Sequence, residues 1–367
     1  MIPNQWYAVL ESREVKPGRL LGVTRLGEKL VFARDREGKV ICLRDRCAHR
    51  GAALSLGELC GDLIQCPFHG FQYDCRGRGR LIPANGKNSP VAERFRVVSY
   101  PAAEKHGFVF IWWGENPPDD IGEPFFFDDI DEGFRFRTAV DPWSAHYSRA
   151  VENQLDVVHL PFVHRDTIGR GNATLVNGPV VEKKGEDHIV VHPYNAVDTG
   201  QVPVKAEEIA PPYTSFHVEF HFPNLWQNWI ADAVRIVIAF VPVDSEHSLL
   251  YLRFYQKFLR LPLLGDLAAL MGIPFSLKIA HQDRRIVQTQ VPKPSGLGIG
   301  ENLVQGDGPI AAYRLRRQEL IDLARKAATR QAGRADAGAS NPRRGRGFRG
   351  RTKPPGTARG PRGGREK

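Results

Sequence analysis

The stretch CAHRGAALSLGELCGDLIQCPFHG, from Cys47 to Gly70, contains two short arms that each carry one cysteine and one histidine. Cys47 and His49 form a C-x-H arm. After sixteen intervening residues, Cys66 and His69 form a C-x-x-H arm. A tetrahedral zinc finger usually gathers both cysteines on one arm and both histidines on the other. The mixed arms therefore favour a different kind of metal centre.

A [2Fe-2S] cluster of the Rieske type needs two cysteines on one iron and two histidines on the other, because imidazole ligands raise its reduction potential above that of an all-cysteine cluster. Two arms that each supply one residue of each kind can hold the two irons from opposite sides. We expect Cys47 and Cys66 to bind one iron, and His49 and His69 to bind the other. A glycine follows each pair, where the backbone must pass close to a cluster. A structural zinc site is the alternative.

A second informative stretch, WSAHYSRAVENQLDVVHLPFVH, ends at His164. On a helix, Glu152, Asp156 and His159 are spaced by four and three residues, so they would share one face. Pro161 removes a backbone donor and clashes with the preceding turn, which predicts that the helix ends or kinks just after His159. This break would let the imidazoles of His159 and His164 turn toward one point and bind a metal together.

The two motifs together resemble those of the catalytic α subunits of Rieske non-haem iron oxygenases. The run C-P-F-H-G-F-x-Y-D, which ends at Asp74, is similar to that family's cluster motif, and E-x-x-x-D-x-x-H-x-x-x-x-H is similar to its mononuclear-iron motif. The resemblance covers about residues 5–330. It implies that His159 and His164 bind Fe(II) with a carboxylate from a late helix, and Asp283 matches that ligand. A salt bridge from Asp283 to a nearby arginine is the alternative.

The resemblance also implies how the two centres cooperate. In this family, the cluster of one subunit serves the iron of its neighbour in a ring-shaped trimer, and an aspartate bridges the cluster histidine and the iron histidine. Asp156, three residues before His159, matches that aspartate and is expected to fix the tautomer of His159. Glu152 or Asn153 is expected to support it.

Composition and pattern divide the chain into an all-β part and a mixed part, so the expected class is α+β. Residues 1–115 contain short strands, rich in β-branched and aromatic residues, between turns. Residues 116–124 are rich in proline and acidic residues and are expected to be a linker. Residues 125–330 are expected to form the catalytic domain, for which the resemblance implies a helix-grip fold, a curved antiparallel sheet with helices. A last amphipathic helix is expected over 310–330.

The net charge of +10 is concentrated at the end of the chain. Residues 331–367 contain eleven Lys and Arg against two acids, so this segment carries +9 of the net charge of +10. It is rich in glycine, proline and arginine and has a single aromatic residue, Phe348, so it cannot bury enough apolar surface to fold. We expect a disordered basic tail, with nonspecific nucleic-acid binding as the alternative role.

The sequence contains no apolar run of about 18 residues and no signal-peptide pattern, so we expect a cytoplasmic protein without a membrane span. Cys42, Cys60 and Cys75 remain beside the candidate cluster ligands. Their odd number and scattered positions do not make a disulfide framework, which suits a reducing compartment.

These features predict an oxygenase that takes electrons from a separate reductase or ferredoxin, uses O2, and hydroxylates or oxidatively demethylates an apolar or aromatic substrate. No flavin or nicotinamide fingerprint occurs in the chain, which is why the reductase is expected to be separate. The alternative is a Rieske electron-transfer protein without oxygenase activity. The modest length favours a homotrimer and a monooxygenase or demethylase. Leu225, Trp226, Asn228 and Trp229 are expected to line the substrate pocket or to pack in the core.

Overall fold

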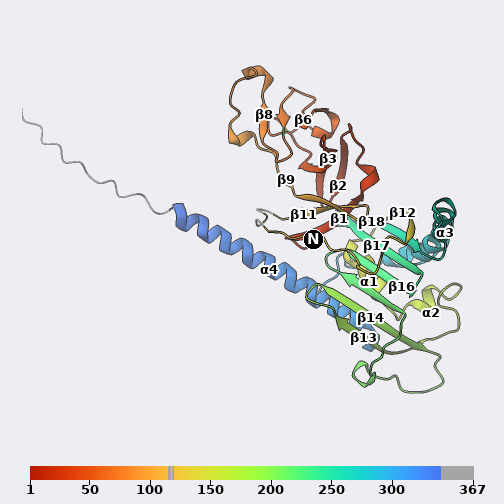
Figure 1. The fold of residues 1–367 in the computed structure, drawn as a ribbon. Helices are drawn as coiled ribbons and strands as arrows, with labels where there is room; N and C mark the ends of the chain where they lie inside the picture. The colour runs from red at the N-terminus through yellow and green to blue at the C-terminus, as the bar shows by residue number, and fades with distance from the viewer. Residues whose placement is uncertain (115–116, 118–119, 340–367) are drawn as a thin grey trace, which may run out of the picture. The chain divides into compact units, whose positions relative to one another are not determined.

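The computed structural model of the chain describes residues 1–114, 117 and 120–339. Figure 1 shows the order of its elements along the chain. Residues Met1–Ala324 form one compact unit, and a second unit begins at Arg325. Both candidate metal sites belong to the first unit.

The N-terminal region is built from short antiparallel strands joined by turns. Its strands form three sheets in the described part of the chain, with the orders β1-β11-β10, β2-β3-β4-β9 and β5-β6-β7-β8. The strands are β1 (Gln5–Glu11), β2 (Leu21–Arg25), β3 (Glu28–Arg34), β4 (Val40–Arg44), β5 (Glu58–Cys60), β6 (Leu63–Gln65), β7 (Gln72–Tyr73), β8 (Gly79–Leu81), β9 (Ser99–Tyr100), β10 (Ala102–Lys105) and β11 (Phe108–Trp113). The expected all-β class of this region is confirmed.

A small apolar core lies beneath the two cysteine–histidine arms. It contains Val31 of β3, Leu43 of β4 and Ile64 of β6, all buried. Cys47 and Cys66 belong to the same core. Burial of apolar area is the main favourable term in folding, so the packing that stabilises these sheets also holds both arms in place.

The C-terminal region is organised around one antiparallel sheet, which has seven strands within the described residues. Its order is β12-β18-β17-β16-β15-β14-β13, so most neighbours in the sheet also follow one another in the chain. The strands are β12 (Arg135–Trp143), β13 (Leu175–Lys183), β14 (His188–Ala196), β15 (His217–His221), β16 (Leu225–Ala231), β17 (Val234–Pro242) and β18 (Ser248–Gln256). The exception is β12, which closes back on β18.

Helices cover one face of this sheet. A buried core joins Val191 and Phe240 of the sheet to Tyr147, Ile273 and Tyr313 of the helices. The α-helices of the described chain are α1 (Tyr147–Leu155), α2 (Leu160–Val163), α3 (Pro262–Val287) and α4 (Gly308–Ala339). The combination of an all-β region with a sheet-and-helix region confirms the expected α+β class.

The helix α3 lies close to β18 because Gly272 has no side chain. A Cβ atom on Gly272 would lie 2.5 Å from ring atoms of Phe254 in β18, far inside van der Waals contact. A glycine inside a helix costs roughly 1 kcal/mol relative to alanine. The close packing that it permits sets the distance of α3 from the sheet, and with it the position of Asp283 further along the helix.

The other face of the sheet packs against the N-terminal region. Tyr7 and Leu10 of β1 and Phe108 of β11 share one buried core with Val237 and Tyr251 of the sheet. The two regions therefore meet through apolar packing as well as through the connecting segment.

Two buried polar side chains support this contact. The Asn224 side chain accepts a hydrogen bond from the Ala8 N–H at 3.2 Å and donates one to the Ala8 carbonyl at 2.9 Å. The Arg253 guanidinium donates to the carbonyl oxygens of His106 at 2.6 Å and Gly107 at 2.9 Å. Because unpaired buried polar groups are costly, these bonds favour one register between β1 and the large sheet.

Two expected segments reach the limits of the described chain. Of the expected linker, residues 116, 118 and 119 lie outside the described residues. The expected last helix is α4, which begins at Gly308 and continues to Ala339, beyond the expected end at Arg330. Residues 340–367 of the expected basic tail lie outside the described residues.

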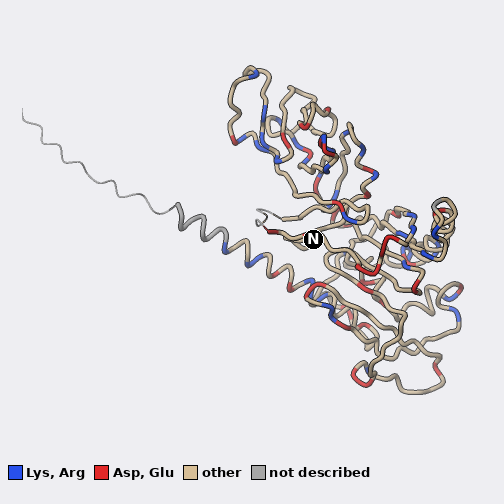
Figure 2. The backbone as a smooth tube through the Cα atoms, viewed as in Figure 1, with Lys and Arg blue, Asp and Glu red and all other residues tan. Residues whose placement is uncertain are grey.

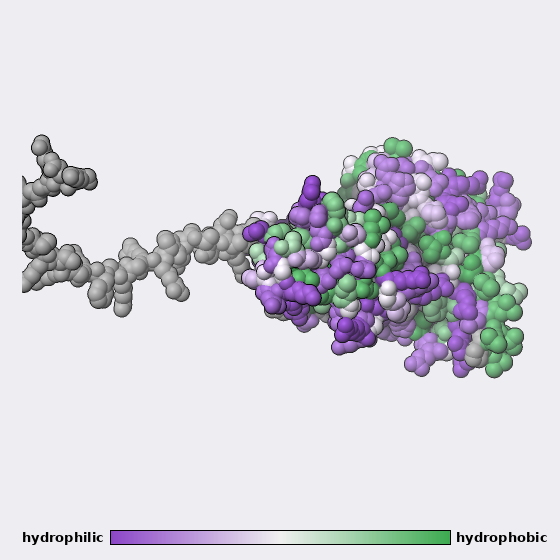
Figure 3. Space-filling view, turned by 90° about the horizontal axis from the view of Figure 1, so that it is seen from above, coloured by the Kyte–Doolittle hydropathy of each residue, from purple (hydrophilic) through white to green (hydrophobic). Residues whose placement is uncertain are grey.

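The outer face of α3 exposes large apolar side chains. By length and composition alone, Leu263–Val287 of α3 could cross a membrane, and 28% of its most apolar window is buried. Core helices of soluble proteins meet the same criterion, and α3 carries the buried Asp283. Figure 3 shows apolar residues at the right-hand edge of the molecule, the side where α3 lies in Figure 1. Neighbouring exposed apolar residues indicate a contact surface, here formed by Leu263, Leu267, Leu270, Met271 and Phe275.

Candidate metal centres

The two cysteine–histidine arms form loops with the same backbone hydrogen bonds. In the first loop, the Cys47 N–H donates to the Ala52 carbonyl at 2.8 Å, and the Gly51 N–H donates to the Cys47 carbonyl at 2.9 Å. The second loop repeats both bonds around Cys66, at 2.8 and 3.1 Å, with Gly70 as the second donor. Both glycines have positive φ angles, +77° and +69°, which other residues rarely adopt. This conformation explains why a glycine follows each ligand pair.

The cysteines of these loops are buried and the histidines are exposed. Cys47 and Cys66 retain 3% and 2% of their accessible surface, whereas His49 and His69 lie at the surface. The two imidazole rings lie edge to face, with 4.8 Å between their centroids. His49 also stacks on Phe71 at 4.7 Å. Two buried thiols opposite two exposed imidazoles fit a cluster with one iron toward the core and one toward the surface.

The hydroxyl group of Tyr73 contacts the first loop. It lies 3.1 Å from Cys47 Sγ and accepts a hydrogen bond from the Ala48 N–H at 3.2 Å. Because Ala48 is the donor in that second bond, the hydroxyl proton of Tyr73 is free to point at the sulfur. Burial and the nearby Cys47 raise the pKa of Tyr73 well above its usual value, so the donor stays protonated at neutral pH.

The helix expected to carry Asp156 and His159 ends before both. α1 stops at Leu155, and Asp156 has extended backbone angles, φ −76° and ψ 127°. Its carboxylate accepts hydrogen bonds from the N–H groups of Val158 at 2.6 Å and His159 at 3.3 Å. Such a local side-chain turn competes with the helix. The expectation that Glu152, Asp156 and His159 share one helical face is therefore wrong.

Pro161 begins a short helix instead of ending a long one. α2 carries Pro161 in its first turn, where a missing N–H has no helical partner to lose. His159 directly precedes α2, and His164 directly follows it. Their Nε2 atoms lie 3.2 Å apart, so the break in the helix turns both imidazoles toward one point, as the sequence predicts.

Asp283 of α3 lies against both imidazoles. Its Oδ1 atom is 2.9 Å from Nε2 of His164 and 3.4 Å from Nε2 of His159. The three ligand atoms lie within 4.8 Å of one another. Two imidazoles and one carboxylate with open positions suit Fe(II) in oxygenases. The alternative of a salt bridge to Arg284 is not favoured, because Arg284 pairs with Asp141.

Amide side chains orient two of these three ligands. Gln282 Oε1 accepts a hydrogen bond from the Thr167 hydroxyl at 2.9 Å and lies 2.9 Å from His164 Nδ1. Because this oxygen can only accept, the proton of a neutral His164 belongs on Nδ1, which leaves Nε2 free to bind a metal. Gln154 Nε2 donates to Asp283 Oδ2 at 3.1 Å, which leaves Oδ1 directed at the histidines.

The charges of the three residues depend on one another. Burial lowers the pKa of His159, but the nearby carboxylates of Asp156 and Asp283 outweigh this effect and raise the pKa to about 9. Burial raises the pKa of Asp283, but His159 and His164 outweigh it and lower the pKa. The carboxylate is thus charged and needs a cation beside it. A divalent metal would supply that positive charge in place of a proton, because metal binding releases ligand protons.

The two residues expected to support Asp156 have other partners. Glu152 pairs with Arg314 at 2.6 Å, so the expected support of Asp156 by Glu152 is absent, because the buried Arg314 takes that carboxylate. Asn153 Nδ2 lies 3.5 Å from Asp283 Oδ1, beside the triad rather than beside Asp156.

The four candidate pocket residues on β16 divide between the two faces of the sheet. Leu225 packs in the core shared with the N-terminal region, and Trp229 alternates onto the same face. Trp226 packs on the helix side, where its Nε1 donates to the Gln154 carbonyl at 3.0 Å. Asn228 shares that side, and its buried Oδ1 atom has no hydrogen-bond partner.

A pair of cysteine–histidine loops and a two-histidine, one-carboxylate site in one compact unit define a protein with an iron–sulfur centre and a mononuclear iron centre. Comparison with family models agrees with this class. Residues 5–101 match the Rieske [2Fe-2S] domain, and residues 143–323 match the vanillate O-demethylase oxygenase C-terminal domain.

Known relatives identify the family. The chain is 30% identical over 295 residues to methylxanthine N1-demethylase NdmA of Pseudomonas putida. This match covers 78% of this chain and 79% of that protein. It is 33% identical over 185 residues to the iron–sulfur subunit of the toluene-4-sulfonate monooxygenase system of Comamonas testosteroni, and spans 52% of that subunit. The match to chlorophyllide a oxygenase of Chlamydomonas reinhardtii spans 25% of its length. The chain belongs to the Rieske non-haem iron oxygenases, whose cofactors are a [2Fe-2S] cluster and a mononuclear iron.

Solved structures agree on the fold. A structure of NdmA from Pseudomonas putida matches with a TM-score of 0.71 and 24% identity, over 88% of this chain and 92% of that chain. Dicamba monooxygenase matches with a TM-score of 0.64 and 21% identity, over 89% and 99% of the two chains. At these identities the likeness supports the fold of both regions.

The contact between Tyr73 and Cys47 predicts a measurable effect on the cluster. A hydrogen bond to a cluster sulfur stabilises the reduced, more electron-rich state. Tyr73→Phe should therefore lower the reduction potential by tens of millivolts, since about 1 kcal/mol for one bond corresponds to about 40 mV for one electron. The measurement is a redox titration followed by EPR. Tyr100→Phe is the matched control, because its hydroxyl bonds to Glu28 instead. Equal potentials in all three proteins would contradict the proposed bond.

Proposed function

We propose that the protein is an O2-dependent oxygenase that hydroxylates or oxidatively demethylates a small apolar or aromatic substrate with electrons from a separate donor. The observation that carries this proposal is the buried triad of His159, His164 and Asp283 in the same unit as the cysteine–histidine loops. An electron carrier requires only the loops. The mononuclear site therefore favours the oxygenase over the electron-transfer alternative.

In this proposal, Cys47, His49, Cys66 and His69 hold the cluster, and the triad holds Fe(II). When bound, the cluster supplies single electrons and the mononuclear iron supplies O2 activation. The chain's own groups prepare these sites. The core beneath the loops keeps water from the thiolates, and Gln282 and Gln154 keep the donor atoms of the triad aimed at one point.

The external electron donor is proposed to be an acidic reductase or ferredoxin. Arg46 and Arg50 are exposed beside the first loop, and Arg76 and Arg94 are exposed on nearby turns. Figure 2 shows Lys and Arg distributed along the loops of this region. Positive charge around the exposed cluster edge speeds association with a negatively charged partner.

We also propose that the enzyme is a homotrimer in which each cluster serves the iron of the next subunit. In Figure 1, the loops beside β6 and the helix α2 lie at opposite ends of the compact unit, which disfavours transfer within one chain. Exposed apolar residues lie near both sites: Leu56 and Phe68 beside the cluster, and Phe162 in α2. Two different patches of this kind suit a head-to-tail contact, which closes into a ring. Asp156, whose side chain is 24% exposed, is proposed to bridge the two centres there.

The same surfaces bear on the location of the protein. We propose that it is cytoplasmic and does not span a membrane, with the apolar face of α3 covered by protein contacts in the trimer. Asp283 supports this placement, because a buried carboxylate near the end of α3 is bound to the folded core.

The first experiment tests the oxygenase itself. Anaerobic, dithionite-reduced protein with nitric oxide should give both a Rieske EPR signal and a ferrous-nitrosyl signal, and aromatic substrates should stimulate O2 uptake with a reductase. His164→Ala should keep the Rieske signal and lose both the nitrosyl signal and O2 uptake. Cys66→Ser should lose the Rieske signal and keep the ferrous-nitrosyl signal, and it should also lose turnover. A wild-type protein with the Rieske signal alone would support the electron carrier.

The bridging role of Asp156 predicts a loss of turnover without a loss of metal. Asp156→Asn should retain both EPR signals, and its turnover should fall by at least about 10- to 100-fold, as for other residues that hold metal ligands. Asp166→Asn is the matched control, since this exposed carboxylate pairs only with Arg165 in the described contacts. Full activity of Asp156→Asn would exclude the bridge.

Transfer between subunits predicts that two inactive chains restore activity when mixed. Co-expressed Cys66→Ser and His164→Ala chains should form mixed trimers in which an intact cluster faces an intact iron site. Different affinity tags on the two chains would isolate the mixed species, and light scattering would give its mass. Mixed oligomers that remain inactive would exclude cooperation across the subunit contact.

A further inference from the structure

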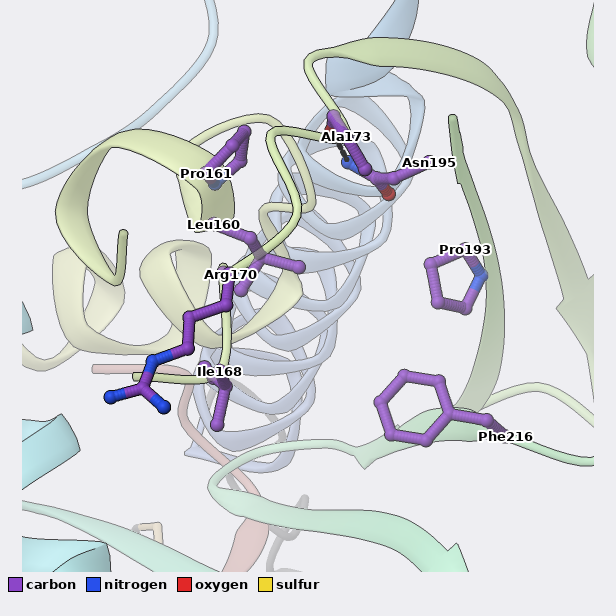
Figure 4. Close-up of a pocket in the computed structure, with 9 residues that line it drawn as sticks. Leu160, Pro161, Ile168, Arg170, Ala173, Pro193, Asn195 and Phe216 are labelled. Atoms are coloured by element: carbon purple, nitrogen blue, oxygen red, sulfur yellow. Dashed lines mark hydrogen bonds between the residues drawn. The ribbon is translucent and has the colours of Figure 1, made fainter. Parts of the chain in front are cut away.

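A cavity lies between α2 and strands β14 and β15, on the side of the sheet that faces the helices. Its volume is about 220 Å³, which suits one aromatic ring or a small two-ring system rather than a larger fused polycycle. Figure 4 shows the cavity between the α2 side and the strand side. The residues that shape it are Leu160, Pro161, Ile168, Pro193, Asn195 and Phe216.

One wall of the cavity is formed by the short helix that separates the two candidate iron-binding histidines in the chain. Leu160 and Pro161 belong to α2, the short helix between His159 and His164. Across the cavity, Asn195 of β14 donates a hydrogen bond from Nδ2 to the carbonyl of Val157 at 2.9 Å. One wall therefore belongs to the helix flanked by His159 and His164, and the opposite wall is bonded to the segment that precedes them.

Asn195 and Arg170 have the polar side chains among the residues that line the cavity, and the orientation of the Asn195 amide is determined by its contacts. Its Nδ2 group donates to Val157 O, and lies 3.5 Å from the carbonyl of Ala173. A flipped amide would place its oxygen against these two carbonyl oxygens, so the assignment of the two amide atoms is fixed. The Oδ1 atom is then buried, and it has no hydrogen-bond partner.

A buried acceptor without a partner costs free energy that a bound donor would recover. In Figure 4, the Asn195 amide stands at one end of the space between Leu160 and Pro193. An aromatic ring placed between these apolar walls could direct an O–H or N–H group at Oδ1. A methylated version of the same group could not donate, and it would leave the acceptor unpaired.

We propose that Asn195 Oδ1 is the specificity-determining acceptor of the substrate pocket, and that the pocket selects monocyclic or small bicyclic aromatic compounds that carry an O–H or N–H donor. This inference rests on the proposed function for the identity of the pocket as a substrate site. It assigns Asn195 a recognition role in addition to its bond to Val157. Ligand pockets commonly combine apolar walls with a few fixed polar groups in this way.

The test compares ligands that differ only in the donor. Phenol is paired with anisole, and indole with 1-methylindole, and binding is measured by calorimetry on the iron-loaded, reduced protein without O2. The wild type should bind the donor-bearing member of each pair about tenfold more tightly. In Asn195→Leu, which lacks the acceptor, the two members of each pair should bind with nearly equal affinity. An equal affinity for both members in the wild type would overturn the proposal.

A second variant separates recognition from anchoring. Asn195→Asp keeps an acceptor oxygen but loses the donor to Val157, so it should retain the preference for the donor-bearing ligand. If Asn195 only anchored Val157, Asn195→Leu and Asn195→Asp would change the affinities for both members of a pair by the same factor. The ratio of the two affinities would then stay as it is in the wild type. Ile168→Val is the control for the apolar wall, and it should weaken both members of a pair equally. EPR signals of both centres and the thermal unfolding midpoint check that each variant is folded.

Parallel O2-uptake measurements keep this inference distinct from the proposed function. A donor preference that depends on Asn195, with no O2 uptake for any compound, would support the binding site and contradict the oxygenase. O2 uptake with no dependence on the donor or on Asn195 would support the oxygenase and overturn the role of Asn195.

Discussion

A buried carboxylate is the constraint on which the catalytic region depends. Asp283 retains 1% of its accessible surface, and an isolated charge at such a position would cost many kcal/mol. The fold meets this cost with two imidazoles on one carboxylate oxygen and the Gln154 amide on the other. These partners come from α1 and from the two ends of α2, so α3 reaches its position only when all of these elements are assembled. The candidate metal site is therefore also a junction in the fold.

The two candidate centres use burial in opposite ways. In the cysteine–histidine loops, the thiols face the core and His49 and His69 face the surface. In the triad, His164 and Asp283 are buried, and His159 retains the largest exposure, 13%. Each centre thus turns one histidine edge outward. Electrons that pass between proteins or subunits need such an edge, whereas the core behind each site excludes water.

The candidate ligands could be proposed from sequence because metal binding requires particular residue types at short spacings. The arms around Cys47 and Cys66 and the pair His159 and His164 are local patterns of this kind. The path of the backbone between the ligands was harder to predict. The carboxylate of Asp156 binds its own downstream N–H groups, and periodicity cannot show that this turn outcompetes another turn of helix. Likewise, α4 continues past Arg330 to Ala339, a length that the pattern over 310–330 does not predict.

The supporting residues could not be predicted because their roles arise from tertiary contacts. Nothing in the sequence near Tyr73, Thr167 or Gln154 indicates that these side chains contact candidate metal ligands, or the residues that orient them, on other elements. The same reasoning applies to Asn195, which bonds to the segment just before His159 from a strand on the far side of the cavity. Since one wall of the cavity and the turn that carries His159 share this bond, the shape of the cavity and the direction of the imidazole depend on the same contacts. If the proposed pocket and the candidate iron site are as assigned, substrate fit and metal geometry are linked properties of this fold.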